Sequence, residues 1–237
     1  MNKKVILISV DGMRPDGLQT CGNPYVKTME KLGAYTYSGR SMVPSVTFPC
    51  HFSMAHSVVP QRHGLLTNTY VPQVRPIKGI FEKINDNGGV SAMLYGWEPL
   101  RDIALPGALR HAVYVNAYTE ESSDTVLTDH AERIIDRYDP DFTFLYMVET
   151  DEKGGHDSGW MTSTYLDYIS QYEVNCQLAM QGLGTATSEL VDMLGLNIHK
   201  AVLLSVVRED MVEPIMKCLE DKFATIRNGK GIAFAVP

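Results

Sequence analysis

Two acidic residues of this 237-residue chain follow closely on short apolar runs that are typical of buried strands. Asp11 directly follows residues 5–10, and Asp151 lies just after residues 142–148. In open α/β sheets the ligand site forms outside the carboxyl ends of the strands, where two carboxylates can converge on a cation. His156 could add a nitrogen ligand, and this donor set suits zinc. Each acid alone is better explained as the cap of a turn or helix, but the pair with His156 favours metal binding.

A second group that could do chemistry is the hydroxyl pair Ser45 and Thr47, which stands just before Phe48 and Pro49. A hydroxyl at a helix start lies near unpaired backbone N–H groups, and these favour an anion. A bound metal could lower the pKa of that hydroxyl and make it a nucleophile. The simpler alternative is that Ser45 or Thr47 caps the helix. Spacing alone favours the cap.

The elements that must position these residues alternate along the first 170 residues. We expect strands at residues 5–10, 90–95 and 142–148, and helices at residues 25–32, 77–87 and 122–138, with a further helix beginning near Phe48. Residues 149–159 are expected to form a polar loop. This alternation predicts an α/β fold with a largely parallel sheet and helices on both faces. Residues 174–237 show a separate, compact βαβαβ pattern.

Composition and charge exclude several classes of protein. The net charge of −7 and the pI near 5.5 argue against a nucleic-acid-binding surface, which needs clustered Lys and Arg. The four cysteines form no CxxC pair, so we expect neither a disulfide framework nor a structural zinc site, and a reduced, cytoplasmic location fits. The apolar run near the N-terminus stops at Asp11 without a cleavage site, and no stretch is long enough to span a bilayer.

Four segments in order resemble the type I phosphodiesterase/nucleotide pyrophosphatases of the alkaline phosphatase superfamily. They are residues 6–16 (ILISVDGMRPD), 44–53 (PSVTFPCHFS), 63–68 (HGLLTN) and 149–156 (ETDEKGGH). The resemblance covers residues 3 to about 172. It implies an alkaline-phosphatase-like parallel sheet flanked by helices and a metal-dependent hydrolase of phosphate esters, with nucleotides among its substrates.

The resemblance also implies a role for each matching residue. Thr47 would attack phosphorus and form a phosphothreonine intermediate. Asp11 and Thr47 would contact one zinc ion, and Asp151 and His156 would contact a second. Asn68 would donate a hydrogen bond to a phosphoryl oxygen. The catalytic residues implied are therefore Thr47 and Asn68, and the metal ligands implied are Asp11, Thr47, Asp151 and His156.

Two features depart from the family pattern. The family places its loop histidine four residues after the aspartate, whereas His156 follows Asp151 by five, with Gly154 and Gly155 between them. The family also supplies an Asp-His pair and a distant histidine later in the chain. No Asp-His pair follows His156 here, and His199 is the one later histidine. This pattern predicts an incomplete zinc site that binds metal weakly or not at all.

The tail has a resemblance of its own. Residues 182–190 (GLGTATSEL), 200–207 (KAVLLSVV) and 229–234 (GKGIAF) are similar to the later part of a PII-like nitrogen-regulatory domain. The resemblance implies a partial ferredoxin-like α+β module over residues 173–237, joined to a phosphodiesterase-like domain at residues 1–172. It also implies a homo-oligomer that binds nucleotides. The alternative functions are therefore a nucleotide-binding regulatory protein and a chimera without activity.

Overall fold

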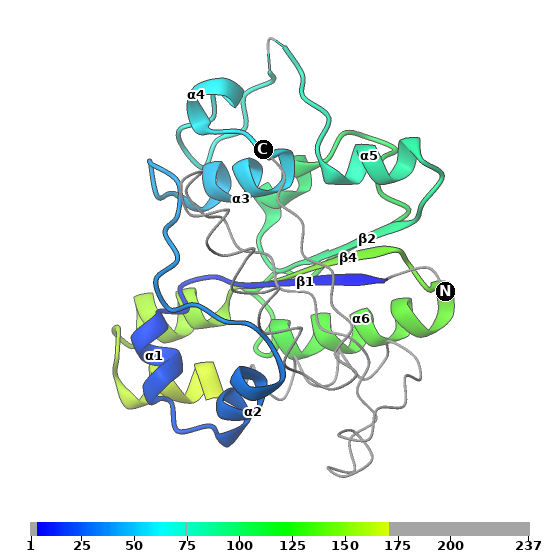
Figure 1. The fold of residues 1–237 in the computed structure, drawn as a ribbon. Helices are drawn as coiled ribbons and strands as arrows, with labels where there is room; N and C mark the ends of the chain where they lie inside the picture. Colours follow the sequence, from blue (N-terminus) through cyan, green and yellow to red (C-terminus); the bar gives the residue numbers. More distant parts are fainter. Residues whose placement is uncertain (1–3, 74, 171–237) are drawn as a thin grey trace.

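The computed structural model describes residues 4–73 and 75–170 of the chain. The PII-like module expected at residues 173–237, its implied oligomer and the boundary at residue 172 lie outside these residues. Within them, one parallel sheet is covered on both faces by helices, as the alternation of elements predicts (Figure 1).

Four parallel strands form the sheet: β1 (Val5–Val10), β2 (Ser91–Tyr95), β3 (His111–Tyr114) and β4 (Phe142–Met147). Their spatial order is β1-β4-β2-β3, so the last of the described strands inserts between the first two. β1 and β4 pair over their full length, from Val5 opposite Phe142 to Val10 opposite Met147. Their carboxyl ends therefore lie side by side.

Helices cover both faces of the sheet. One face carries α3 (Thr47–His56), α4 (Pro60–His63), α5 (Ile80–Asp86) and the 3₁₀-helix η1 (Glu98–Ile103), and the other carries α6 (Ser123–Tyr138) (Figure 1). The short helices α1 (Pro15–Thr20) and α2 (Pro24–Leu32) follow β1. A π-helix, η2 (Thr150–Asp157), follows β4 and precedes helical residues 163–170.

Alternating side chains of β4 divide between two apolar cores. Phe144 and Tyr146 pack toward α3 and α5, while Leu145 and Met147 pack toward α6. All four are essentially inaccessible to solvent. A strand buried on both faces needs a continuous apolar sequence, which residues 142–147 have.

The structure confirms most of the expected elements and corrects one of them. The three expected strands and the helices near residues 25–32, 77–87 and 122–138 are present within a few residues of their expected bounds. Residues 149–159, expected to form a loop, instead contain η2. The short elements α1, α4, η1 and β3 were not expected, because runs of four to six residues carry little periodic signal.

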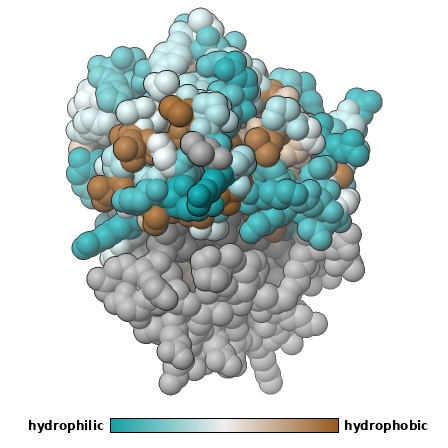
Figure 2. All heavy atoms as spheres, turned by 90° about the horizontal axis from the view of Figure 1, so that it is seen from above, coloured by the Kyte–Doolittle hydropathy of each residue, from teal (hydrophilic) through white to brown (hydrophobic). Residues whose placement is uncertain are grey.

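The surface of the described residues is mixed in polarity. Brown, hydrophobic residues lie among teal, hydrophilic ones over the described part of the face in Figure 2. In the described residues, no helix is both long and apolar enough to cross a membrane. Cys21 and Cys50 are free thiols. The cytoplasmic location stays a prediction.

Candidate active site

Asp11 and Asp151 lie near each other at the carboxyl ends of the neighbouring strands β1 and β4. The backbone N–H of Asp11 donates to the carbonyl of Met147, which continues the pairing of the two strands by one residue. Gly12 then turns the chain at φ +67°, directly against Asp151. A Cβ atom on Gly12 would lie 2.6 Å from both Cα and Oδ1 of Asp151. Glycine at this position therefore allows the two acidic segments to touch.

The electrostatics of the site reflect this proximity. Burial raises the pKa of Asp151 to about 6, with a further contribution from the negative charge of Asp11. The hydroxyl of Tyr146 donates a 2.6 Å hydrogen bond to Oδ2 of Asp11. Burial and the Asp11 carboxylate hold the pKa of this phenol well above its usual value, so it remains a donor. Asp11 is thus fixed by a neutral partner from β4.

His156 reaches Asp151 because residues 150–157 form a π-helix. Residues i and i+5 of a π-helix are joined by backbone hydrogen bonds and lie one turn apart, whereas in an α-helix the residue one turn on is i+4. The five-residue spacing between Asp151 and His156 therefore keeps both on one side of the helix. Nε2 of His156 lies 3.6 Å from Oδ2 of Asp151. The spacing between Asp151 and His156 is one residue longer than in the family, and the π-helix accommodates this additional residue. From the sequence alone we expected a loop in which flexible glycines accommodate it.

Side chains from α6 hold the start of η2. The buried carboxylate of Asp124 accepts hydrogen bonds from the backbone N–H groups of Val148 and Glu149. The buried carboxylate of Glu149 accepts from the N–H of Ser123 and pairs with Lys153 at 2.6 Å. These bonds fix the point where β4 ends and the segment carrying Asp151 begins.

Tyr165 holds the other acidic segment. Its buried hydroxyl donates to the carbonyl of Gly12 at 2.7 Å and accepts from the N–H of Arg14 at 2.9 Å. Its ring lies against Trp160, which in turn packs on Gly155 and contacts His156 edge-on. One aromatic pair therefore buttresses both the turn after Asp11 and the end of η2.

Thr47 is the first residue of α3, and its side chain does not cap that helix. The N-cap is Val46, which has no side-chain bond to the helix, and the cap interaction comes from Asn68, whose Oδ1 accepts from the N–H of Phe48 at 2.9 Å. Within the described residues the Thr47 hydroxyl makes no hydrogen bond to the protein. It is partly exposed and lies at the helix end that favours an anion.

His51 links the start of α3 to the acidic residues. Its Nδ1 lies 2.7 Å from the carbonyl of Thr47, and its Nε2 lies 2.9 Å from Oγ of Ser9. A carbonyl can only accept, so Nδ1 carries the proton and Nε2 accepts from Ser9. The ring also stands edge-on to Tyr146 at 5.0 Å, and Tyr146 bonds Asp11. This buried link was not predicted from the sequence, because a histidine at position 51 also fits the apolar face of α3.

The structure thus brings Asp11, Asp151 and His156 together and connects Thr47 to them through His51 and Tyr146. It also adds Glu152, whose carboxylate joins Asp151 and His156 in a group of ligand atoms that all lie within 4.8 Å of one another. Glu152 stands next to Asp151 in the sequence. Because a loop was expected here, the directions of the two side chains could not be predicted.

The donor set fits a divalent cation. Carboxylate oxygens and an imidazole nitrogen are ordinary zinc ligands. Asp11 and Asp151 lie close enough for the charge of one to affect the pKa of the other, and a cation between such groups offsets their repulsion. The residues expected to bind metal therefore have suitable ligand atoms. Asp151 and His156 also lie close enough together to bind one ion.

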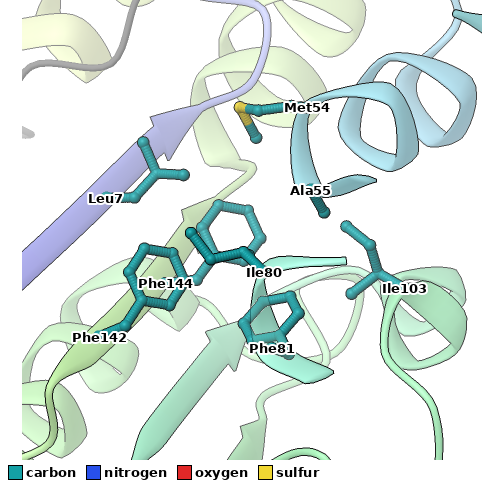
Figure 3. Close-up of a pocket in the computed structure, with 8 residues that line it drawn as sticks. All are labelled: Leu7, Met54, Ala55, Ile80, Phe81, Ile103, Phe142 and Phe144. Carbon is teal, nitrogen blue, oxygen red and sulfur yellow. The ribbon is translucent and has the colours of Figure 1, made fainter. Parts of the chain in front are cut away.

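An apolar cavity lies apart from this chemistry. It has a volume of about 30 Å³ and is lined by eight apolar residues between the sheet and helices α3 and α5 (Figure 3). They are Leu7, Met54, Ala55, Ile80, Phe81, Ile103, Phe142 and Phe144. A space with no polar side chain in its wall favours neither water nor a phosphate.

Known proteins resemble the chain in sequence. Over 200 residues it is 26% identical to mouse ectonucleotide pyrophosphatase/phosphodiesterase family member 1, with 75% of this chain and 22% of that protein aligned. Over 204 residues it is 27% identical to the bovine family member 3, with 76% and 22% aligned. The chain therefore spans less than a quarter of the length of these relatives.

Solved structures share its fold. Murine ectonucleotide pyrophosphatase/phosphodiesterase 5, solved as an inactive threonine-to-alanine variant with AMP, aligns with a TM-score of 0.63 at 18% identity, over 76% of this chain and 52% of that one. Phosphonoacetate hydrolase from Sinorhizobium meliloti, solved with phosphonoacetate, aligns with a TM-score of 0.58 at 19% identity, over 78% and 54%. The alkaline-phosphatase-like α/β fold is confirmed for the described residues.

The family match covers most of the chain. Residues 5–190 match the family described as type I phosphodiesterase / nucleotide pyrophosphatase. These residues include all four segments on which the sequence resemblance rests. The chain belongs to the type I phosphodiesterase/nucleotide pyrophosphatase family.

Proposed function

We propose that this chain carries the nucleophile and part of the metal site of a metal-dependent phosphate-ester hydrolase, with Thr47 as the nucleophile. One observation carries the proposal: two carboxylates and an imidazole gather near the carboxyl ends of β1 and β4, and α3 begins with a hydroxyl that makes no hydrogen bond to any other described residue. Asp11 and Thr47 would hold one zinc ion, and Asp151 and His156 a second. Bound zinc would supply Lewis acidity to a phosphoryl group.

The protein's own groups around Thr47 suit a phosphoryl anion. The start of α3 carries the positive end of the helix dipole and favours negative charge, with the N–H of Phe48 already bonded to Asn68. Oδ1 of Asn68 is occupied by the N–H of Phe48, which leaves its amide NH₂ to donate to a phosphoryl oxygen. Thr47 would lose its hydroxyl proton to water and attack phosphorus in line with the departing alkoxide or phosphate, and a water molecule would then hydrolyse the Thr47–phosphorus ester.

The substrate class proposed is a phosphodiester or a nucleotide pyrophosphate. The relatives named ectonucleotide pyrophosphatase/phosphodiesterase support it, as does the structure of one of them with AMP. That structure was made inactive by replacing a threonine with alanine, which supports a threonine nucleophile in this chain as well.

Hydrolysis of bis(p-nitrophenyl) phosphate and p-nitrophenyl phosphate by the zinc-loaded chain tests the proposal. We expect turnover that a chelator abolishes and that Thr47→Ala lowers at least about 10³-fold, because removing a nucleophile leaves only the other catalytic groups. Thr125→Ala, an exposed threonine of α6, is the matched control and keeps full activity. No turnover above background with zinc, or equal activity of Thr47→Ala, would rule the proposal out.

A further inference from the structure

We infer that Glu152 is a third ligand at the second cation site, so that Asp151, Glu152 and His156 hold a zinc ion within one turn of η2. The inference deepens the proposed function, since it assumes that this segment binds metal. It assigns a ligand that neither the family resemblance nor the order of motifs in the sequence indicated.

The distances suit a tetrahedral ion. Ligands bound about 2.0–2.2 Å from zinc at tetrahedral angles lie about 3.3–3.6 Å from one another. Nε2 of His156 and Oδ2 of Asp151 are 3.6 Å apart, and the Glu152 carboxylate offers an oxygen within 4.8 Å of both. A change of rotamer at Glu152 is enough to close the remaining gap, because its carboxylate ends a flexible side chain.

The helix type makes the three-residue site local. In a π-helix the residue one turn beyond Asp151 is His156, and Glu152 is the immediate neighbour of Asp151 at the same end of η2. In an α-helix the same five-residue spacing would turn His156 away from Asp151. With its one additional residue, this segment therefore forms a cluster of three ligands, and none of them comes from a distant part of the chain.

The charges around the cluster call for a cation. Asp11 adds a third carboxylate beside Asp151, and among the described residues no lysine or arginine pairs with Asp151 or Glu152. Lys153, the nearest lysine in sequence, is held away by Glu149 and by the carbonyls of Glu120 and Glu121. Clustered carboxylates without a compensating base are costly unless a bound ion neutralises them.

Aromatic residues contact two of the three ligands and restrict their orientation. Burial and the nearby negative charge of Glu152 raise the pKa of Tyr118, so this phenol lies beside the Glu152 carboxylate. The ring of His156 stands edge-on to Trp160, with centroids 5.5 Å apart. Partners that orient a ligand are a regular part of metal sites and raise their affinity.

A third ligand matters because zinc sites use three or four protein ligands. The family resemblance assigns two of them, Asp151 and His156, to this segment and leaves the rest to later residues. Glu152 raises the local count to three and leaves one position open for substrate. The incomplete site expected from the sequence is thus completed within η2.

Metal binding by the metal-free full chain tests the inference without measuring turnover. Co²⁺ is titrated by visible absorption and Zn²⁺ by calorimetry, for the wild type, Glu152→Gln and the control Asp157→Asn. Asp157 is an exposed acid of η2 outside the cluster. We expect Glu152→Gln to weaken binding at this site by at least about 100-fold, because even partners that only orient a ligand cost 10–100-fold. Asp157→Asn should bind as the wild type does. A titration of Asp11→Asn, in which the first cation site is removed, identifies the part of the wild-type signal that comes from that first site, so that this part can be subtracted.

Affinity within about two-fold of the wild type for Glu152→Gln, or equal weakening by both variants, would overturn the inference. So would a wild type that binds neither ion. Metal loss in Glu152→Gln without any turnover by the wild type would support Glu152 as a ligand and reject the hydrolase. If turnover depends on Thr47 but Glu152→Gln binds metal as the wild type does, the hydrolase would be supported and Glu152 would be rejected as a ligand.

Discussion

The hydroxyl of Tyr146 lies 2.6 Å from Oδ2 of Asp11, so the strand that leads into the segment with Asp151 also orients the acidic residue that follows the neighbouring strand. Tyr146 is fully buried, and the same ring stands edge-on to His51, which bonds the carbonyl of Thr47. One β4 side chain therefore contacts both the metal-ligand candidate of β1 and the helix that carries the proposed nucleophile.

Tyr146→Phe removes this hydrogen bond while keeping the ring. We expect the free energy of unfolding to fall by about 1–3 kcal/mol, because a buried carboxylate oxygen loses its donor. Urea denaturation measures the change. Tyr138→Phe, at an exposed position at the end of α6, should change stability by less than about 0.5 kcal/mol. Equal effects of the two variants would show that the bond to Asp11 does not contribute.

Gly12→Ala tests the close approach of the two acidic segments. The new methyl group would meet Cα and Oδ1 of Asp151 at 2.6 Å, at a φ of +67° that alanine disfavours. We expect a loss of about 2–5 kcal/mol in thermal or urea unfolding. Gly107→Ala shares the positive φ but has open space around it, so it should lose only about 1–2 kcal/mol. Similar losses for both would mean that Asp151 does not pack on Gly12.

Asn68→Asp separates the two roles of Asn68. The carboxylate still accepts from the N–H of Phe48, so stability should stay within about 0.5 kcal/mol, whereas the donor for a phosphoryl oxygen is lost and a negative charge replaces it. We expect activity to fall at least about 10²-fold. Asn68→Ala should lower both stability and activity, because it also removes the cap. Full activity of Asn68→Asp would leave the residue with a capping role alone.

Acid should destabilise the fold through buried histidines. Burial lowers the pKa of His56 and His63 below the ordinary 6.5, so the folded state favours the neutral rings. Below about pH 6.5 the unfolded chain binds more protons than the folded one, and stability falls as the pH falls through the lowered values. Urea midpoints between about pH 7.5 and 5 measure this slope. His63→Gln should flatten it and the partly exposed His130→Asn should not. A slope unchanged in His63→Gln would contradict the assignment.

The sequence predicted β4 well because a parallel strand buried on both faces needs a largely apolar run, and β1 has a similar run although most of its residues are half-buried. It could not predict that β4 inserts beside β1, since strand order depends on packing between distant segments. That order is what places Asp151 against Gly12. The proximity of the two acids was therefore only a hypothesis until the topology was known.

The helix type of residues 150–157 was missed for a different reason. Polar residues with two adjacent glycines predict a loop, and nothing local distinguishes a π-helical turn. The anchors that support this turn come from elsewhere, with Asp124 in α6 and Tyr165 beyond η2. His51 was missed for the same reason, because its role depends on neighbours far along the chain. Glu152 was missed because its role depends on the helix type of η2.

Mass spectrometry of the zinc-loaded chain, quenched in acid during turnover of a phosphodiester, tests the central claim most directly. We expect the peptide that contains Thr47 to carry a phosphoryl group that retains the second ester substituent of the substrate, and this adduct to be absent in Thr47→Ala. Turnover with the phosphoryl group on another residue, or with none on Thr47 when the quench is faster than the turnover, would contradict it.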